Sequence, residues 1–171
     1  IEKLDDVGVR KVMLPKVEGA RNIVNITKKY DLDYFIMFSS ITTQIGNIGQ
    51  SAYISANSCL DALASSLWNE GRNVLSIGCG PISDIGMLVG HSAALQSFSL
   101  AGIHSIKIEK ILDLIPSLLE MDYPVIDFAH IDWEKWFNVM PRAAESSHFS
   151  AIYNASEKSS LLSETQLILL G

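Results

Sequence analysis

The sequence has few of the residues that would tie the chain to a metal or to a disulfide framework. Its 171 residues include only two cysteines, Cys59 and Cys79, and these do not form a C-x-x-C pair. Neither a disulfide scaffold nor a zinc site is therefore indicated. The four histidines, at positions 91, 104, 130 and 148, also lack metal-ligand spacing, so we expect no bound metal.

Long apolar runs and basic clusters are scarce as well. No stretch reaches the roughly 18 apolar residues that a membrane span needs, and no signal-peptide pattern is present. A net charge of −6 and a pI near 5.1 argue against a nucleic-acid or anionic-membrane surface. We therefore expect a globular protein, with the cytoplasm as its default location. Because the chain begins at Ile1, we also expect it to be a piece of a longer polypeptide.

The most informative stretch, residues 34 to 61, predicts a strand, a loop and a helix. An apolar run ends in a pair of serines, the second of which is Ser40, and a loop rich in Gly, Asn and Gln follows. If residues 52 to 69 are helical, Tyr53 and Asn57 are one turn apart and project from the same face. Ser40 then leaves the end of the strand toward the same place.

These side chains suit the reduction of a carbonyl group by hydride. Hydride addition leaves an alkoxide, so the site needs a donor that polarises the oxygen and an acid that protonates it. We assign the first role to Ser40 and the second to Tyr53. A phenol has an ordinary pKa of about 10 and is tuned by a nearby ammonium group, for which Lys16 is the candidate. Asn57 is suited to hold a water that relays protons from Lys16 to Tyr53.

Each of these residues also has an ordinary structural interpretation. Taken alone, Lys16 beside Pro15 is more readily a solvated surface lysine. Tyr53 would then be a core tyrosine whose hydroxyl is satisfied locally, and Asn57 a residue of the helix surface. The surrounding motifs are what favour the catalytic interpretation.

Several short segments stand in an order and spacing that are typical of one family. They are Leu14-Pro-Lys16-Val-Glu-Gly19-Ala20, Phe38-Ser-Ser40, Gly46-Asn-Ile-Gly49-Gln50, Tyr53-Ile-Ser-Ala-Asn57, Leu60-Asp61-Ala62-Leu63-Ala64, Gly80-Pro81, Gly86-Met87 and Ile131-Asp132-Trp133. With them, roughly residues 8 to 137 resemble the C-terminal half of a ketoreductase domain from a modular polyketide synthase or multifunctional fatty acid synthase, within the short-chain dehydrogenase/reductase superfamily. As in those synthases, the lysine comes from upstream of the tyrosine.

The resemblance implies an active site and a cofactor. The catalytic residues it implies are Lys16, Ser40, Tyr53 and Asn57. It implies NADPH, held by Ser39, Lys16, Tyr53, Gly80, Pro81 and Ile82, and a substrate cleft that includes Ile45, Gln50 and Met87. Residues 82 to 101 would form a lid over cofactor and substrate. Ile45 stands where a tryptophan accompanies one stereochemical outcome, which favours the other, B-type outcome; Cys79 and Ile82 also stand where tryptophans are usual.

The implied reaction is the reduction of a β-ketoacyl thioester on an acyl carrier protein to the β-hydroxyacyl form. The partners would be that carrier protein and other domains of the same synthase, with a homodimeric parent enzyme and neither nucleic acid nor membrane. Two alternatives remain open. One is a non-catalytic structural segment of a synthase, and the other is a free short-chain reductase of small ketones or sugars.

We predict an α/β fold, the C-terminal half of a Rossmann-like doubly wound parallel sheet without its glycine-rich N-terminal units. Whether such a half is active alone is left open. The ketoreductase part should span residues 1 to 140, and a serine-rich linker toward a carrier domain residues 141 to 171. The expected helices cover residues 6 to 30, which is one helix or two joined near Pro15, 52 to 69 and 106 to 119; the expected strands cover 34 to 38, 73 to 77 and 124 to 129.

Overall fold

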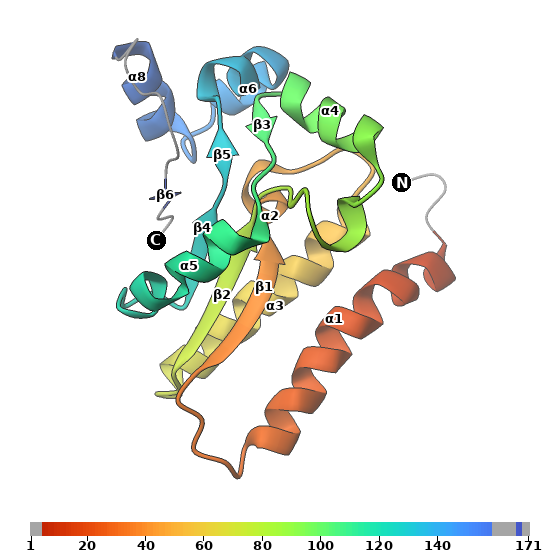
Figure 1. Cartoon of the computed structure of the whole chain (residues 1–171), viewed down its shortest axis with the longest axis vertical. Helices are drawn as coiled ribbons and strands as arrows, with labels where there is room; N and C mark the ends of the chain where they lie inside the picture. Colours follow the sequence, from red (N-terminus) through yellow and green to blue (C-terminus); the bar gives the residue numbers. More distant parts are fainter. Residues whose placement is uncertain (1–4, 159–166, 169–171) are drawn as a thin grey trace. The chain divides into compact units, whose positions relative to one another are not determined.

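The computed structural model describes residues 5–158 and 167–168, which form two compact units (Figure 1). Within the described residues, the first unit comprises residues 5–79 and 116–127, and the second comprises residues 80–115, 128–158 and 167–168. The chain therefore leaves the first unit after Cys79, returns to it after Ile115, and leaves it again after Asp127.

The first unit is built on a parallel sheet. Its elements are α1 (Asp6–Thr27), β1 (Phe35–Ser40), α2 (Thr42–Ile45), α3 (Ser51–Asn69), β2 (Val74–Cys79), the end of α5 (Ile108–Leu119) and most of β4 (Val125–Phe128). β1 and β2 pair in parallel, with Ser39 opposite Gly78. β4 neighbours β2 on its other side, and the Ser76 N–H donates to Pro124 O at 2.8 Å. The predicted parallel α/β sheet is confirmed.

Helix α3 covers one face of β1 and β2, and α1 packs against α3 (Figure 1). The apolar residues at this contact form a core made of Ala20, Met37, Leu60, Ala64, Leu67 and Val74. Alanines at two of these positions bring the helices close to one another and to the sheet. The spacing of these residues in α3 is the helical periodicity that the sequence shows.

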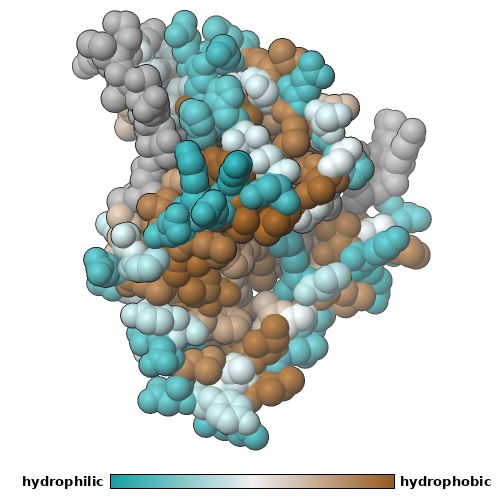
Figure 2. All heavy atoms as spheres, in the orientation of Figure 1, coloured by the Kyte–Doolittle hydropathy of each residue, from teal (hydrophilic) through white to brown (hydrophobic). Residues whose placement is uncertain are grey.

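Helix α1 is continuous through Pro15, so the prediction of two joined helices is not needed. It begins at a capping residue, because the Asp5 carboxylate accepts a hydrogen bond from Gly8 N at 2.7 Å. Figure 2 shows apolar and hydrophilic side chains intermingled along this helix. In the part of the chain that the structure describes, no helix is long and apolar enough to cross a bilayer.

The second unit contains several short elements. Its elements are η1 (Gly86–Leu88), α4 (Ser92–Leu100), β3 (Ile103–His104), the first part of α5, β5 (His130–Ile131), α6 (Trp133–Val139), α7 (Pro141–Ala144), α8 (Ser150–Lys158) and β6 (Leu167–Ile168). β3 and β5 are antiparallel, and the rings of His104 and His130 lie 4.7 Å apart across them. Helix α4 falls within the predicted lid.

The serine-rich segment contains more structure than a linker composition indicates. Phe149 is buried, and its ring lies 4.9 Å from that of Trp136 and 6.1 Å from that of Trp133. This apolar anchor directly precedes α8. The domain boundary at residue 140 and the linker function stay predictions, and residues 159–166 and 169–171 lie outside the described residues.

We predict that Gly102→Ala destabilises the second unit more than Gly90→Ala. Both glycines have φ of 79°, so each alanine incurs the left-handed strain of about 1 to 2 kcal/mol. At Gly102 a Cβ atom would also stand 2.6 Å from Asp132 O, whereas at Gly90 it would meet nothing within 4 Å. The overlap should add about 1 to 3 kcal/mol. Urea unfolding monitored by tryptophan fluorescence measures both variants, and equal losses would contradict this packing.

Candidate active site

Lys16 and Tyr53 lie side by side in the first unit. The Lys16 Nζ is 5.8 Å from the centroid of the Tyr53 ring, and it donates to the main-chain oxygen of Phe38 at 3.2 Å. Three elements thus meet here, because Lys16 comes from the middle of α1, Phe38 from β1 and Tyr53 from the first turn of α3. The structure brings together the lysine and tyrosine that the sequence pairs.

Lys16 is half-buried rather than fully solvated. Burial lowers its pKa, and this effect outweighs the nearby Cys79 and Asp61, which raise the pKa. An ammonium group has three N–H donors, and Lys16 uses one of them on Phe38 among the described residues. Its other two donors therefore remain available to a ligand.

Asn57 lies one turn after Tyr53 and is completely buried. Its Nδ2 donates to the main-chain oxygen of Tyr53 at 2.8 Å, and its own main-chain oxygen accepts from the Ser39 hydroxyl at 3.4 Å. The interpretation of Asn57 as a helix-surface residue is therefore wrong. Its Oδ1 is buried without a hydrogen-bond partner among the described residues. The proposed water relay from Lys16 stays a prediction.

Ser40 is held by Thr42, a residue that the sequence analysis missed. The Ser40 Oγ accepts from the Thr42 hydroxyl at 2.9 Å and from the Thr42 N–H at 3.3 Å. With both acceptor positions occupied, the Ser40 hydroxyl proton is left to donate elsewhere. The hydroxyl run from Ser39 to Thr43 was the signal that could have found this contact, since Ser and Thr bond to nearby groups where strands end. No hydrogen bond joins Ser40 to Tyr53 or Lys16 within the described residues.

The predicted substrate residues have different environments. Ile45 is the last residue of α2 and is buried, and Gln50 is the half-buried residue that precedes α3. α2 itself was expected to be loop. Gly46 and Gly49, with φ of 72° and 79°, confirm the backbone freedom expected in that segment. The side chain of Met87 lies outside the described residues.

The predicted cofactor residues Gly80, Pro81 and Ile82 belong to the second unit, where packing fixes them. A Cβ atom on Gly80 would stand 3.2 Å from the Cβ of Ala129, a tight contact, so packing alone favours glycine at this position. The Pro81 oxygen accepts from Ile106 N at 2.9 Å, and Ile82 forms a parallel bridge with Ile106. The turn is therefore well defined whether or not it contacts a cofactor.

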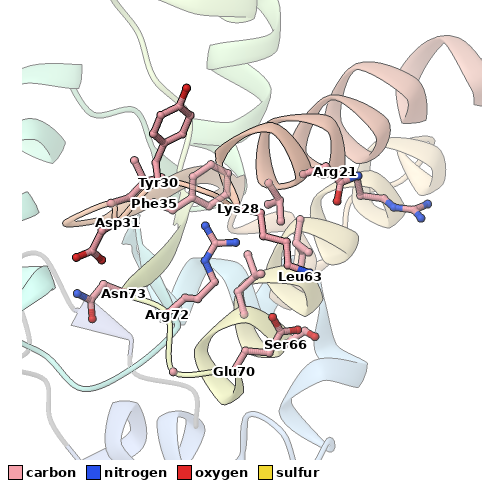
Figure 3. A pocket seen from close by; sticks show the side chains of 15 residues that line it. Arg21, Lys28, Tyr30, Asp31, Phe35, Leu63, Ser66, Glu70, Arg72 and Asn73 are labelled. Atoms are coloured by element: carbon pink, nitrogen blue, oxygen red, sulfur yellow. The ribbon is translucent and has the colours of Figure 1, made fainter.

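A cavity of about 560 Å³ in the first unit lies away from these residues (Figure 3). It is bounded by the end of α1, the segment before β1 and the turn between α3 and β2. Its lining includes Arg21, Lys28, Glu70 and Arg72, and the side chain of Arg72 extends into it. None of the predicted catalytic, cofactor or substrate residues lines this cavity, so it is not the candidate active site.

Comparison with known proteins places the chain in a family. Residues 1–84 match the sequence model of the KR domain. The chain is 29% identical over 157 residues to a subunit of the phenolphthiocerol/phthiocerol polyketide synthase of Mycobacterium tuberculosis, and the match covers 92% of this chain and 7% of that protein. It is 35% identical over 108 residues to the highly reducing polyketide synthase tstA of Talaromyces stipitatus, covering 63% of this chain and 4% of the synthase.

Solved structures agree in fold. An A-type ketoreductase from a modular polyketide synthase superimposes with a TM-score of 0.83 and 26% identity, covering 92% of this chain and 33% of that one. The first ketoreductase of the tylosin polyketide synthase gives a TM-score of 0.79 and 28% identity, covering 90% and 34%. The fold is thus the Rossmann-like fold of short-chain dehydrogenases and reductases. Within that superfamily the chain belongs to the polyketide synthase ketoreductase domains, as the motifs predicted, and it spans about a third of a solved ketoreductase.

We predict that Asp61→Asn lowers the pKa of Lys16 further. Asp61 is one of the two groups that raise this pKa, and asparagine removes its charge while keeping an acceptor for the Ser76 hydroxyl, 2.6 Å away. Titration of the Lys16 side chain by carbon-13 NMR measures the change. Glu18→Gln is the control, because this exposed residue pairs with Arg21 and does not act on Lys16. A Lys16 pKa that rises or stays constant in Asp61→Asn would contradict the electrostatic assignment.

Proposed function

We propose that the chain is the C-terminal part of an NADPH-dependent ketoreductase that acts on a β-ketoacyl thioester attached to an acyl carrier protein. The product would be the β-hydroxyacyl thioester, made within a synthase that carries further domains. The observation that carries this proposal is the convergence of Lys16, Tyr53 and Asn57, with Ser40 oriented by Thr42. The homodimeric state of the parent enzyme stays a prediction.

Each residue has a defined part in the proposed reaction. The Ser40 hydroxyl, whose acceptor positions are filled by Thr42, donates to the substrate carbonyl oxygen. Tyr53 delivers the proton as negative charge develops on that oxygen, and the Lys16 ammonium faces its ring. Because its pKa is lowered, the Lys16 ammonium group is a stronger acid, which favours the proton transfer that returns Tyr53 to its protonated form. Asn57 fixes the first turn of α3 through the main-chain oxygen of Tyr53.

The residues present fit the nicotinamide end of a cofactor. When bound, NADPH would supply the hydride that no side chain can provide. Lys16, which uses only one of its three N–H donors among the described residues, is suited to cofactor hydroxyl groups, and we assign Ser39, Tyr53 and the turn Gly80–Ile82 to the same end. The sequence has no glycine-rich phosphate turn, because Gly78 and Gly80 are followed by Pro81 and not by the third glycine of that motif.

The edge of the sheet supports the proposal that a further part of the domain precedes this chain. β1 is the first strand of the sheet order and pairs with β2 on one side. Phe38 in this edge strand is 42% exposed. An exposed strand edge with an aromatic side chain is normally covered or paired. A strand from an upstream half of the domain would fill that position.

We predict that Tyr53→Phe abolishes reduction of a β-ketoacyl thioester while leaving NADPH binding intact. The test uses the full polypeptide in which the chain is encoded, and fluorescence titration measures NADPH binding. Loss of the phenolic proton should lower kcat by about 100-fold or more. Tyr34→Phe is the matched control, because Tyr34 is half-exposed and lies just before β1, outside the site.

The same polypeptide separates the alternatives. If wild type binds NADPH but neither wild type nor Tyr34→Phe reduces the thioester, the chain is a structural segment of a synthase. If free small ketones are reduced faster than the carrier-bound thioester, a free short-chain reductase is favoured. Tight NADPH binding by the 171 residues alone would contradict the proposal that a further part of the domain is needed to complete the cofactor site.

We predict that Thr42→Val lowers kcat and that Thr42→Ser restores it. Valine has the shape of threonine but lacks the hydroxyl that donates to Ser40 Oγ. A lost hydrogen bond of about 1 kcal/mol corresponds to a loss of about fivefold, provided that the contact orients Ser40 in the transition state. Steady-state kinetics measures the ratio of the two variants. Equal activity of Thr42→Val and wild type would show that Thr42 does not orient Ser40 for the reaction.

A further inference from the structure

Three residues form a row across the sheet on the face that α3 covers. Ser39 of β1 is opposite Gly78 of β2 in the parallel register, and its hydroxyl contacts α3 at Asn57. Asp127 of β4 is the third residue of the row, because a Cβ atom built on Gly78 would overlap with Asp127 Oδ1. The row thus runs from the strand beneath Asn57 to the buried carboxyl group of Asp127.

The absence of a side chain at Gly78 leaves room for the Asp127 carboxyl group. Any other residue at position 78 would put an atom where Asp127 Oδ1 lies, and that atom would also come 3.5 Å from the carbonyl carbon of Ser40. The missing side chain therefore lets the carboxyl group reach across β2 toward β1. Asp127 is only 2% exposed, so this carboxyl group is buried.

Two buried side-chain oxygens in the described residues have no hydrogen-bond partner, and they are Asn57 Oδ1 and Asp127 Oδ1. The amide oxygen can only accept a hydrogen bond, and an ionised carboxylate likewise only accepts. A protonated carboxyl group can donate. Because an unsatisfied buried polar atom is costly, a single proton on Asp127 would satisfy both oxygens at once.

The surroundings of Asp127 favour that proton. Burial, and then the charge of Asp61 on α3, raise the pKa of Asp127 to about 7, although a hydrogen bond from Gln44 of α2 acts in the opposite direction. Burial, and then the charge of Asp127, raise the pKa of the Cys79 thiol in β2 to about 12, against the opposite effect of Lys16. Lys16 on α1 faces Cys79 and Asp61 as the nearby cation.

We propose that the carboxylic acid of Asp127 donates a hydrogen bond to Asn57 Oδ1, directly or through one bridging water, and so positions Asn57 against Tyr53. This inference rests on the proposed function for its effect on reduction, but the contact itself does not. With Oδ1 engaged, Asn57 Nδ2 must face the Tyr53 main-chain oxygen, which is the bond present in the structure. Asp127 is thus a positioning residue.

Loss of the proton reverses this preference. Ionised Asp127 repels the amide oxygen of Asn57 and attracts its Nδ2, so the amide turns over and leaves the Tyr53 oxygen. The first turn of α3 then loses a side-chain contact beside the proton donor. Reduction should therefore fall as the pH rises through about 7, where Asp127 ionises.

NMR of the 171-residue chain tests the contact without any assay of activity. The side-chain amide resonances of Asn57 should shift with a midpoint near the pKa of about 7, and Asp127→Asn should abolish that shift. Asn69, exposed at the end of α3, is the internal control and should not titrate. An Asn57 amide that does not titrate, or that titrates equally in Asp127→Asn, would overturn the proposal.

Two further variants should move the midpoint in opposite directions while leaving Asp127 in place. Asp61→Asn removes a charge that raises the pKa of Asp127 and should lower the midpoint. Gln44→Met removes a hydrogen bond that lowers the pKa and should raise the midpoint. Shifts of the same sign in both variants would assign the titration to another group and overturn the proposal.

The effect on catalysis is measured by steady-state kinetics of the full polypeptide in which the chain is encoded. In Asp127→Asn, the decline of kcat between about pH 6 and about pH 8 should flatten, with KM for NADPH unchanged, because asparagine can donate at every pH. A decline that persists unchanged would overturn the positioning role. If no form of the polypeptide reduces the thioester, the proposed function fails while the NMR result still decides whether Asp127 contacts Asn57.

Discussion

The parallel register of β1 and β2 is the constraint on which the candidate site depends. It sets Ser39 opposite Gly78 and Ser40 opposite Cys79, so the two strands end together beneath the first half of α3. Residues alternate between the faces of a strand, so Ser39 bonds to α3 while the next residue bonds to Thr42. A slip of one residue would turn Ser39 away from α3 and remove its hydrogen bond to Asn57.

Helix α3 serves two purposes along its length. Its residues Leu60, Ala64 and Leu67 lie in an apolar core, whereas Asn57 is buried and bonded to Ser39 of β1 and Asp61 accepts a hydrogen bond from Ser76 of β2. Burying polar groups is costly unless they are paired. The apolar half supplies the packing that holds the polar half in position, and the low dielectric there strengthens every charge acting on Lys16.

Structural features that depend on residues close together in the sequence were predicted correctly from local sequence patterns. Periodicity indicated the strands and the long helices, and the spacing of Tyr53 and Asn57 placed both on α3. Residues whose roles depend on contacts with residues distant in the sequence were missed. Asp127 stands in an ordinary apolar strand pattern, and nothing near it in sequence indicates that Gly78 makes room for it. The pairing of His104 with His130 across β3 and β5 was missed for the same reason.

The order of the two units along the chain has a consequence for biosynthesis. β4, with Asp127, is translated only after Gly80–Ile115, which belong to the other unit. Until β4 has been synthesised, β2 therefore lacks its neighbour on that side, and the Asp127 carboxyl group is absent from the space beside Gly78. Neither unit can be completed before part of the other has been made, so the two must fold as interleaved pieces of one nascent chain.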